Sequence, residues 1–492
     1  MELEFQKTEI PCLHTILRQV QTQEQTQEVR LSDEMPDIGR VLSCWGQVML
    51  RGKEWRTGAL SVNGGVMVWV LYAPEDGSAM QCLQTWLPMQ IKCDLPGNEP
   101  DGDIIAVPAL YSVDARSTAS RKMIVRASIG ICVEGICPGK ENVYSVQDLP
   151  DDVFKLENKY PVCIPSETGE KAFSVDEIIK LPATYPEPAK ILRYELQPEI
   201  AEQRLLSDKL IFRGTAVVHI LYIDKEGKLH SYETEVPISQ YAELKEDHPE
   251  DSDASVCVAL TNLEVDMIED CNLQVKAGLV AQYCIFDCTT ICVTEDAYSP
   301  SRQIKPEVGE MKVPVVLERR TQMLTAEWNL KEDNCAIVDV AFYPEHPRMY
   351  RDDGMVTAEL SGNFHILYTD AEGMLRSKIF RWEDKREWAA ASEAKVNAVL
   401  TSVGIDNAGN DVKLRMDITV TGESGVPMVM GLEMGDICEQ DPERPSLILR
   451  KLGDKRLWDI AKENGSSVDM IKKINNIQQE PDEERMLLIP VL

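Results

Sequence analysis

One short stretch of sequence occurs three times in this chain, and its spacing limits what the chain can fold into. The stretch is clearest at residues 218–227, returns at 364–373, and has a divergent copy at 68–77. Each copy is rich in β-branched and aromatic residues and ends in glycine, which predicts a strand followed by a tight turn with glycine at positive φ. The central leucines of successive copies are 150 and 146 residues apart. This period is too long for a solenoid and predicts three copies of one domain.

A second pair of matching stretches supports the same period. Pro36-Asp37-Ile38 has a counterpart in Pro186-Glu187-Pro188, again 150 residues later. Short β-branched runs alternate with polar turns, which is typical of antiparallel sandwiches and barrels. We therefore expect a mainly β chain of three tandem antiparallel repeats, each sandwich-like or barrel-like. The expected strands are 41–50, 66–72, 80–87, 107–113 and 123–133 in the first copy, with a hairpin turn at Asn63-Gly64, then 209–222, 229–236, 256–265 and 273–292, and finally 355–368, 375–381, 396–405 and 412–421.

Polar, proline-containing stretches between the copies predict the domain boundaries. The last segment changes character, because helical periodicity, nearly absent before it, appears between two short apolar runs. The expected divisions are an N-terminal strand and polar segment at 1–30, repeat one at 31–137, a linker at 138–172, repeat two at 173–300, repeat three with a leading linker at 301–439, and a small domain at 446–492.

Charge and hydropathy restrict the partners of the chain. Its 51 lysine and arginine residues and 82 aspartate and glutamate residues give a formal net charge of −31. Phosphate neutralisation needs clustered basic residues, so we expect neither nucleic acid nor anionic lipid as a main partner. The first residues are acidic where a signal peptide would be basic, and no apolar run has the length of a spanning helix. We therefore expect a cytosolic protein that meets membranes only indirectly.

The sequence contains no recognisable motif for catalysis or cofactor binding. It has no nucleophile elbow, zinc-protease motif or phosphate-binding glycine loop, so we expect no enzyme, no catalytic residue and no cofactor. The 14 cysteines do not form a framework of pairs, and buried thiols are the expectation for a reducing cytosol. Cys284, Cys288 and Cys292 are evenly spaced, but at about 3.3 Å per residue strand neighbours four apart are about 13 Å from each other. They cannot share one ion, and we expect no metal site.

Two histidines occupy equivalent positions in the repeated stretch. They are His219 and His365, and Trp69 holds the same position in the first copy. A metal-binding histidine would not be replaced by tryptophan, and neither histidine has a second ligand at metal spacing. We therefore expect these side chains to pack in the core or across strands.

The C-terminal segment predicts a βααβ module with a small core. Its helices have recognisable ends, because glycine and asparagine favour helix C-termini and serine favours N-caps. The expected elements are a strand at 447–450, a helix starting within 453–462 and ended by Gly465, a second helix capped by Ser466 or Ser467 with Asp469 at capping-box spacing from Ser466, Asn475-Asn476 at its end, and a strand at 486–490.

This module resembles the LysM family. The resemblance rests on Gly453-Asp454, Leu457-Trp458, Ile460-Ala461-Lys462, Val468, Ile471, Asn475-Asn476 and Leu488-Ile489-Pro490. LysM modules usually have one threonine after Gly-Asp, whereas Lys455-Arg456 stand here and add a residue to the loop that holds N-acetylglucosamine chains in sugar-binding members. Trp458 is either a sugar-stacking residue or a core anchor, and its apolar neighbours favour the core. The expected partner-binding residues are Gly453, Asp454, Lys455, Arg456, Leu457, Trp458, Asn475, Asn476 and Ile477.

The repeated stretch and its proline-containing openings resemble the SPOCS repeats of spore coat proteins. Three such repeats followed by a LysM module are similar to the SipL-type family of spore coat morphogenetic proteins. The resemblance implies a non-enzymatic protein of the mother-cell cytoplasm, placed at the forespore surface. It further implies that the LysM module docks on a basement-layer ATPase of the coat, and other coat proteins are possible partners. The alternative is a LysM protein that binds peptidoglycan, and the altered loop counts against glycan binding.

Overall fold

The structure, a computed structural model, is mainly β, with two short helices among its described residues. Its strand pairs are antiparallel, and a βααβ arrangement ends the chain, so the predicted fold class is confirmed. Within the described part of the chain, no helix is long and apolar enough to cross a membrane. The described residues are 2–3, 5–97, 101–146, 149–268, 272–327, 336–352, 355–389, 397–408, 411–437, 444–478 and 485–492.

Two antiparallel sheets recur three times along the chain, and we call each pair of sheets a unit. In unit 1 the sheets are β3–β4–β5 and β2–β7–β6, and in unit 2 they are β9–β10–β11 and β12–β13–β8. In unit 3, β17 pairs with β15, β16 and β18, and β20 pairs with β14, β19 and β1. The opening strands β2, β8 and β14 start 148 residues apart.

The strands of unit 1 are β2 (Gln6–Arg30), β3 (Ile38–Arg56), β4 (Ala59–Pro74), β5 (Gln81–Asp94), β6 (Asp103–Ala119) and β7 (Lys122–Ser145). Those of unit 2 are β8 (Phe154–Ile179), β9 (Pro188–Leu206), β10 (Lys209–Asp224), β11 (Leu229–Glu243), β12 (Asp253–Met267) and β13 (Leu273–Tyr298). Those of unit 3 are β14 (Arg302–Glu327), β15 (Ala336–Pro344), β16 (Arg348–Asp352), β17 (Met355–Thr369), β18 (Leu375–Ala389), β19 (Asn397–Ala408) and β20 (Asp411–Ile437), with β1 (Glu2–Leu3) at the edge.

The turn predicted at the end of each repeated stretch is present. Gly77, Gly227 and Gly373 have φ values of 74°, 83° and 77°, which only glycine adopts without strain. In unit 2 the Asp224 carboxylate accepts hydrogen bonds from the backbone of Glu226 and Lys228 at 2.8 and 2.9 Å and holds the turn in shape. Because these interactions are local, the turns could be predicted from the sequence.

The turn predicted at Asn63-Gly64 is wrong. Both residues lie inside β4, paired with β3 and β5, and the hairpin reverses instead at Gly58, where φ is 80°. Gly64 is required for another reason, because a Cβ there would lie 2.3 Å from the carbonyl oxygen of Met49. The glycine allows close approach of two strands rather than a turn.

The expected polar part of 1–30 and the expected linker at 138–172 are largely strand. Residues 1–30 contain the single long strand β2, and the 138–172 segment belongs largely to the end of β7 and the beginning of β8. Their polar residues follow the alternation of a half-exposed strand: from residue 21 to 26, side chains are alternately half-buried and exposed. The segment 294–308 likewise contains the end of β13 and the start of β14, and most of 440–445 lies outside the described residues.

The three units close into a ring. In each unit, the last strand of the first sheet packs against the first strand of the corresponding sheet in the next unit: β5 meets β9, β11 meets β15, and β18 meets β3. The equivalent position of the repeated stretch makes a contact across each junction. These contacts are Trp69 with Tyr194, edge to face at 5.1 Å between ring centroids, His219 with Asp339, at 2.6 Å, and His365 with the backbone of Cys44.

The junction between units 2 and 3 contains a buried ionic network. Arg193 of β9 and Asp339 of β15 are both completely buried, and Arg193 donates to that carboxylate at 2.5 Å. Arg193 also pairs with Glu195 and lies over the ring of Trp45 of unit 1, 5.1 Å from its centroid. His219 is buried, as expected. Its carboxylate partner was not foreseen, because Asp339 lies 120 residues further along the chain.

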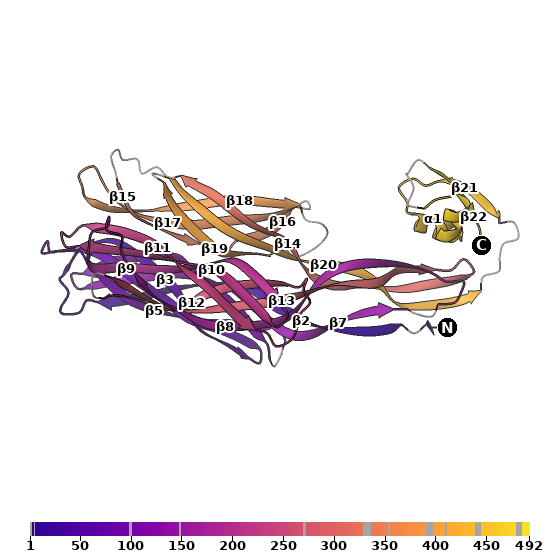
Figure 1. The fold of residues 1–492 in the computed structure, drawn as a ribbon, viewed down its shortest axis with the longest axis horizontal. Coiled ribbons are helices and arrows are strands. Elements are labelled where there is room, and N and C mark those ends of the chain that lie inside the picture. The colour runs from indigo at the N-terminus through magenta and orange to yellow at the C-terminus, as the bar shows by residue number, and fades with distance from the viewer. Residues whose placement is uncertain are drawn as a thin grey trace.

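Beyond the ring, three pairs of long strands continue as two-stranded ribbons: β2 with β7, β8 with β13, and β14 with β20 (Figure 1). Residues from all three ribbons share one apolar cluster, so the ribbons support each other where the two-sheet units have ended. The buried members are Cys12, Val143, Val162, Ile164, Ile291, Val293, Met311, Val313, Val426 and Met428.

One disulfide joins the two strands of the unit 2 ribbon. Cys163 of β8 and Cys288 of β13 are register partners and are bonded, although 125 residues separate them in sequence. The expectation of thiols alone is therefore wrong for this pair, because strand pairing rather than sequence spacing brings the two residues together. The other two members of the evenly spaced trio differ in environment, since Cys284 is buried and Cys292 is exposed.

Removing the carboxylate of Asp339 is expected to destabilise the protein strongly. Asp339→Ala leaves Arg193 and His219 buried without their partner, and breaking a buried ion pair in this way costs about 3–5 kcal/mol. Denaturant unfolding should show this loss. Glu372→Ala, in an exposed turn, is the matched control and should change stability by no more than about 0.5 kcal/mol. Equal effects of the two substitutions would contradict the network's role.

The same network predicts a pH dependence. Burial opposes the charged form of His219, but the Asp339 carboxylate, with a further hydrogen bond to Glu233, raises the pKa to about 9. A base whose pKa is raised by folding contributes stability that is complete below its unfolded pKa, about 6.5, and is lost as pH rises through the folded pKa. The stability difference between the natural protein and His219→Gln should therefore shrink between about pH 6.5 and 9. Denaturation series across this range would measure it, and a constant difference would argue against a charged imidazole.

Candidate partner-binding surfaces

The C-terminal module is built from four short elements. They are β21 (Leu447–Lys451), α1 (Leu457–Asn464), α2 (Val468–Ile474) and β22 (Met486–Pro490), and the two strands pair antiparallel. Helices this short are not stable alone, so their shared core must hold them. The buried core residues of the module are Leu452, Leu457, Trp458, Ile460, Ala461, Ile471, Ile477, Leu487 and Ile489.

The helix ends largely follow the sequence signals. Gly465 ends α1 with φ of 59°, as predicted. Ser467 is the N-cap of α2, and its side chain accepts from the backbone nitrogen of Met470 at 3.2 Å. The capping box expected between Ser466 and Asp469 is therefore wrong, because Ser466 lies one position earlier and is completely buried.

Three of the expected partner-binding residues are buried in the core of the module. They are Leu457, Trp458 and Ile477, with exposed fractions of 1%, 7% and 8%. The interpretation of Trp458 as a core residue is therefore confirmed. Their side chains support the loops around them and have little surface to offer a ligand.

Asn475 holds the module together from within. Its side-chain amide donates to the carbonyl oxygen of Leu488 at 2.6 Å and to that of Ile471 at 2.8 Å, and its carbonyl oxygen accepts from the Leu488 backbone at 2.8 Å. These bonds tie the end of α2 to the edge of β22. The neighbouring Asn476 is exposed and has φ of 52°, a conformation that asparagine tolerates better than most residues.

The predicted basic loop is exposed, but its charges have partners. Lys455 pairs with Glu463 of α1, whose pKa is lowered first by that hydrogen bond and also by Arg450. Arg456 lies 3.3 Å from Asp459. Gly453 and Asp454 lie beside this loop, where Gly453 has φ of 64° and Asp454 is exposed. This loop is the part of the predicted site that solvent reaches most easily.

The module is docked on the end of the unit 2 ribbon. Trp458 donates its indole N–H to Asp296 of β13 at 2.9 Å, and Lys462 reaches the same carboxylate at 2.7 Å. The ring of Tyr298 packs edge to face on Trp458 at 4.8 Å, and its hydroxyl donates to the carbonyl oxygen of Ser466 at 2.7 Å. Burial, together with the Asp296 charge, raises the pKa of Tyr298. Nothing in the local sequence of β13 indicated this contact.

The outer face of the β21–β22 sheet exposes four apolar side chains beside one lysine, Lys451. Leu447 and Leu449 of β21, and Met486 and Leu488 of β22, are 47%, 62%, 52% and 37% exposed. Leu449 and Leu488 are register partners, so these side chains lie together on one face. The opposite face carries Leu487 and Ile489 into the core. We call these four residues the outer apolar face.

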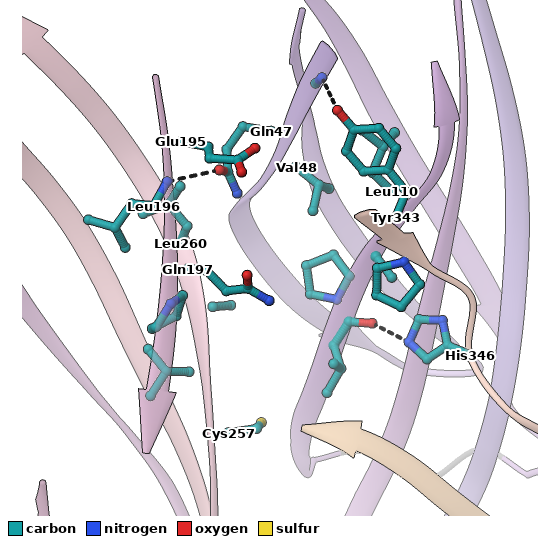
Figure 2. Close-up of a pocket in the computed structure, with 18 of the residues that line it drawn as sticks. Gln47, Val48, Leu110, Glu195, Leu196, Gln197, Cys257, Leu260, Tyr343 and His346 are labelled. Carbon is teal, nitrogen blue, oxygen red and sulfur yellow. Dashed lines mark hydrogen bonds between the residues drawn. The ribbon is translucent and has the colours of Figure 1, made fainter. Parts of the chain in front are cut away.

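A cavity of 190 Å³ lies where the three units meet (Figure 2), with walls from β3 and β6 of unit 1, β9 and β12 of unit 2, and β15 of unit 3. Several of the polar groups around it are engaged in contacts between units. Gln47 accepts from the Leu196 backbone at 3.2 Å, and Tyr343 accepts from the Gly46 backbone at 3.1 Å. His346 contacts the Val107 carbonyl at 3.0 Å, and burial lowers its pKa to about 4. We therefore interpret the cavity as a gap in the packing between the three units.

Part of unit 2 matches the model of a known protein family. Residues 188–268 match the family model described as SipL, SPOCS domain. The matched segment starts at β9 and ends just after β12, so it spans one whole sheet of unit 2 and one strand, β12, of the other. Unit 2 is therefore similar to a SPOCS domain, which supports a SipL-type protein. No curated protein and no solved structure matches the chain.

Removing Asp296 is expected to loosen the docked module without unfolding it. Asp296→Ala deletes the acceptor of both Trp458 and Lys462, and hydrogen bonds to a charged group are worth about 1.5–3 kcal/mol. Hydrogen exchange of the α1 amides should become about 10-fold to 100-fold faster, while the core strand β10 is unchanged. Asp454→Ala in the exposed loop is the control. Unchanged α1 exchange in Asp296→Ala would show that apolar packing alone holds the module.

Proposed function

We propose that this protein is a non-enzymatic morphogenetic component of the spore coat, with three SPOCS repeats and a C-terminal LysM module. The observation that carries the proposal is the SipL, SPOCS domain match over 188–268, within one of three units of the same sheet topology. The repeated stretch at equivalent strands of the other units supports assigning them to the same domain type. Its place would be the mother-cell cytoplasm at the forespore surface.

The C-terminal module is the proposed docking element, and its partner is the basement-layer ATPase of the coat. Solvent reaches the Gly453–Arg456 loop, Asn476 and the outer apolar face among other surface residues of this module. A few large apolar side chains at the centre of a contact supply most of the binding energy of protein interfaces. The basic loop at its margin suits an acidic rim on the partner.

A scaffold also has to hold several bound partners at fixed positions relative to one another, and the three-unit ring would do this. Once one element binds, the others act at a high effective concentration, so weak contacts combine into stable recruitment. The buried ionic network and shared ribbon core favour this role because they keep the units from moving independently. Other coat proteins are the proposed partners of the ring.

Glycan binding remains the alternative function of a LysM-like module. Three features of the module weigh against it. Trp458 is engaged by Asp296 and Tyr298, so its ring is covered by the ribbon. Asn475 uses its side chain inside the module. A polar sugar would also gain little from an aliphatic face such as Leu447 and Leu449.

The proposal is tested by measuring binding of the full chain to the coat ATPase after charging the outer apolar face. Leu449→Asp should weaken binding by at least about 10-fold, since a central apolar contact is worth about 1.4 kcal/mol or more. Ile379→Asp replaces an equally exposed apolar residue on β18, where Ile379 is 55% exposed, and serves as the control. Equal binding by both variants would exclude this face. Retention on chitooligosaccharide with no ATPase binding would favour the glycan alternative.

A further inference from the structure

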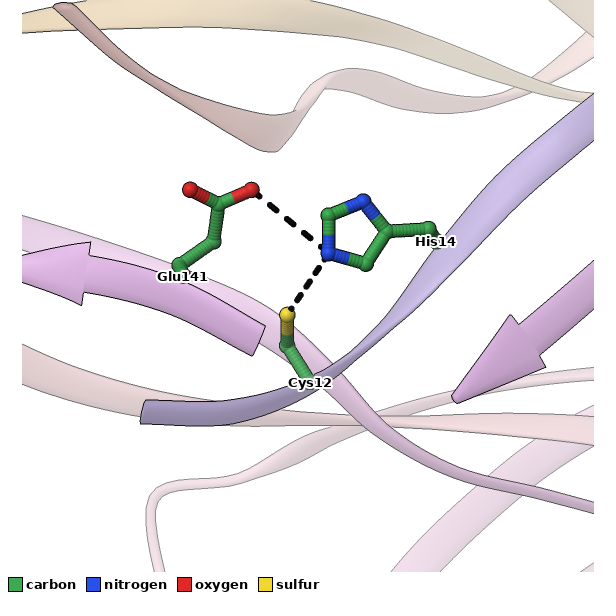
Figure 3. A group of neighbouring side chains, drawn as sticks. All are labelled: Cys12, His14 and Glu141. Atoms are coloured by element: carbon green, nitrogen blue, oxygen red, sulfur yellow. Dashed lines mark hydrogen bonds and ion pairs between the residues drawn. The ribbon is translucent and has the colours of Figure 1, made fainter. Parts of the chain in front are cut away.

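A cysteine, a histidine and a glutamate converge on the unit 1 ribbon (Figure 3). Cys12 and His14 lie two residues apart on β2, so their side chains share one face of the strand. Glu141 comes from the facing strand β7, where it is the register partner of Ile10. The Cys12 sulfur is 3.2 Å from His14 Nε2, and that nitrogen is 3.6 Å from a carboxylate oxygen of Glu141.

The backbone opposite leaves room for this arrangement. Gly139 is the register partner of Cys12, and the imidazole of His14 lies over it. A Cβ at Gly139 would be 2.0 Å from His14 Cδ2 and 2.5 Å from Nε2, so any other residue would displace the ring. The position therefore requires glycine for the sake of the histidine side chain rather than for its backbone angle.

The separations suit a single small cation. Zinc is bound at about 2.3 Å by thiolate and about 2.0–2.2 Å by imidazole and carboxylate, so ligands at tetrahedral angles are about 3.4–3.6 Å apart. The observed separations of 3.2 Å and 3.6 Å are close to this spacing. All three ligand atoms lie within 4.8 Å of one another. The thiol and the carboxylate are separated by at most 4.8 Å, so side-chain rotation would bring all three atoms around one ion.

The three side chains differ in their exposure to solvent, so an ion could enter from solvent and still be partly enclosed by protein. Cys12 is buried in the cluster shared by the three ribbons, whereas the His14 and Glu141 side chains are 39% and 25% exposed. Cysteine binds metal as the thiolate, so a bound divalent cation displaces the thiol proton of Cys12 and neutralises the Glu141 carboxylate.

We propose that Cys12, His14 and Glu141 bind one divalent transition-metal ion of the zinc class. Thiolate, imidazole and carboxylate together are ligands of zinc rather than of calcium or magnesium. Three protein ligands leave a fourth position for water. The ion ties β2 to β7 at the point where the three ribbons share their core, so its effect is to stabilise the ribbon end of the molecule. The expectation of no metal site, drawn from sequence, is replaced by this proposal.

The test uses full-length protein, freed of metal by chelation and kept reduced. Cobalt(II) added as a spectroscopic substitute should give a thiolate-to-cobalt charge-transfer band that saturates at one ion per chain and disappears when zinc is added. Zinc should also raise the melting temperature, because it binds the folded state. Cys12→Ser should abolish the charge-transfer band. Cys292→Ser, at an exposed thiol on β13, should leave it unchanged.

Two further variants keep the test decisive. His14→Gln removes a partly exposed ligand, so it should fold even if Cys12→Ser does not, and it should weaken cobalt binding at least 10-fold. Gly139→Ala should do the same by displacing the imidazole while leaving all three ligands in the chain. The proposal is overturned if the natural protein gives no charge-transfer band, if the band survives in Cys12→Ser, or if His14→Gln binds cobalt as tightly as the natural protein.

Discussion

The structure depends on closure of the ring, in which each unit covers the exposed edge of the next. A three-stranded sheet with a free edge strand is open to unwanted pairing, and here each such edge meets the neighbouring unit. The contacts at the three junctions differ in chemistry: aromatic at Trp69, ionic at His219, and a neutral histidine at His365, whose pKa burial lowers to about 4. Because the three units belong to one chain, each junction can have its own side-chain contacts. Three identical subunits would have the same contacts at every junction.

The ribbons and the C-terminal module are consequences of the same closure. Because the ring brings the units around one axis, the long strands leaving each unit run side by side and can share an apolar cluster. A two-stranded ribbon by itself would be marginal in water. The module then finds its docking place at a ribbon tip, on Asp296 and Tyr298, rather than on the ring. Its outer apolar face is left uncovered by this arrangement.

Local features were predictable from sequence, and features set by distant pairing were not. The glycine turns, the helix end at Gly465 and the buried Trp458 follow from short-range patterns. The strand cores were also predicted, although the second part of β2 was taken for a polar segment and most of β8 for a linker, because half-exposed strands carry many polar residues. In contrast, the disulfide partner of Cys288 and the carboxylate beside His14 lie more than 100 residues away in sequence. No window of sequence contains such pairs.

The course of the opening strands gives the molecule two different ends. β2 begins among the ribbons near the N-terminus and ends at Arg30. The chain then enters β3. The first residues of β3 pair with the last residues of β4, which lie beside the Gly77 turn. Units 2 and 3 repeat this path, so their turns at Gly227 and Gly373 belong to the same end. A strand of 25 residues spans at most about 80 Å. The ribbon tips and the three hairpin turns therefore lie at opposite ends of the molecule, and two partners bound at these ends would be held apart by most of that length.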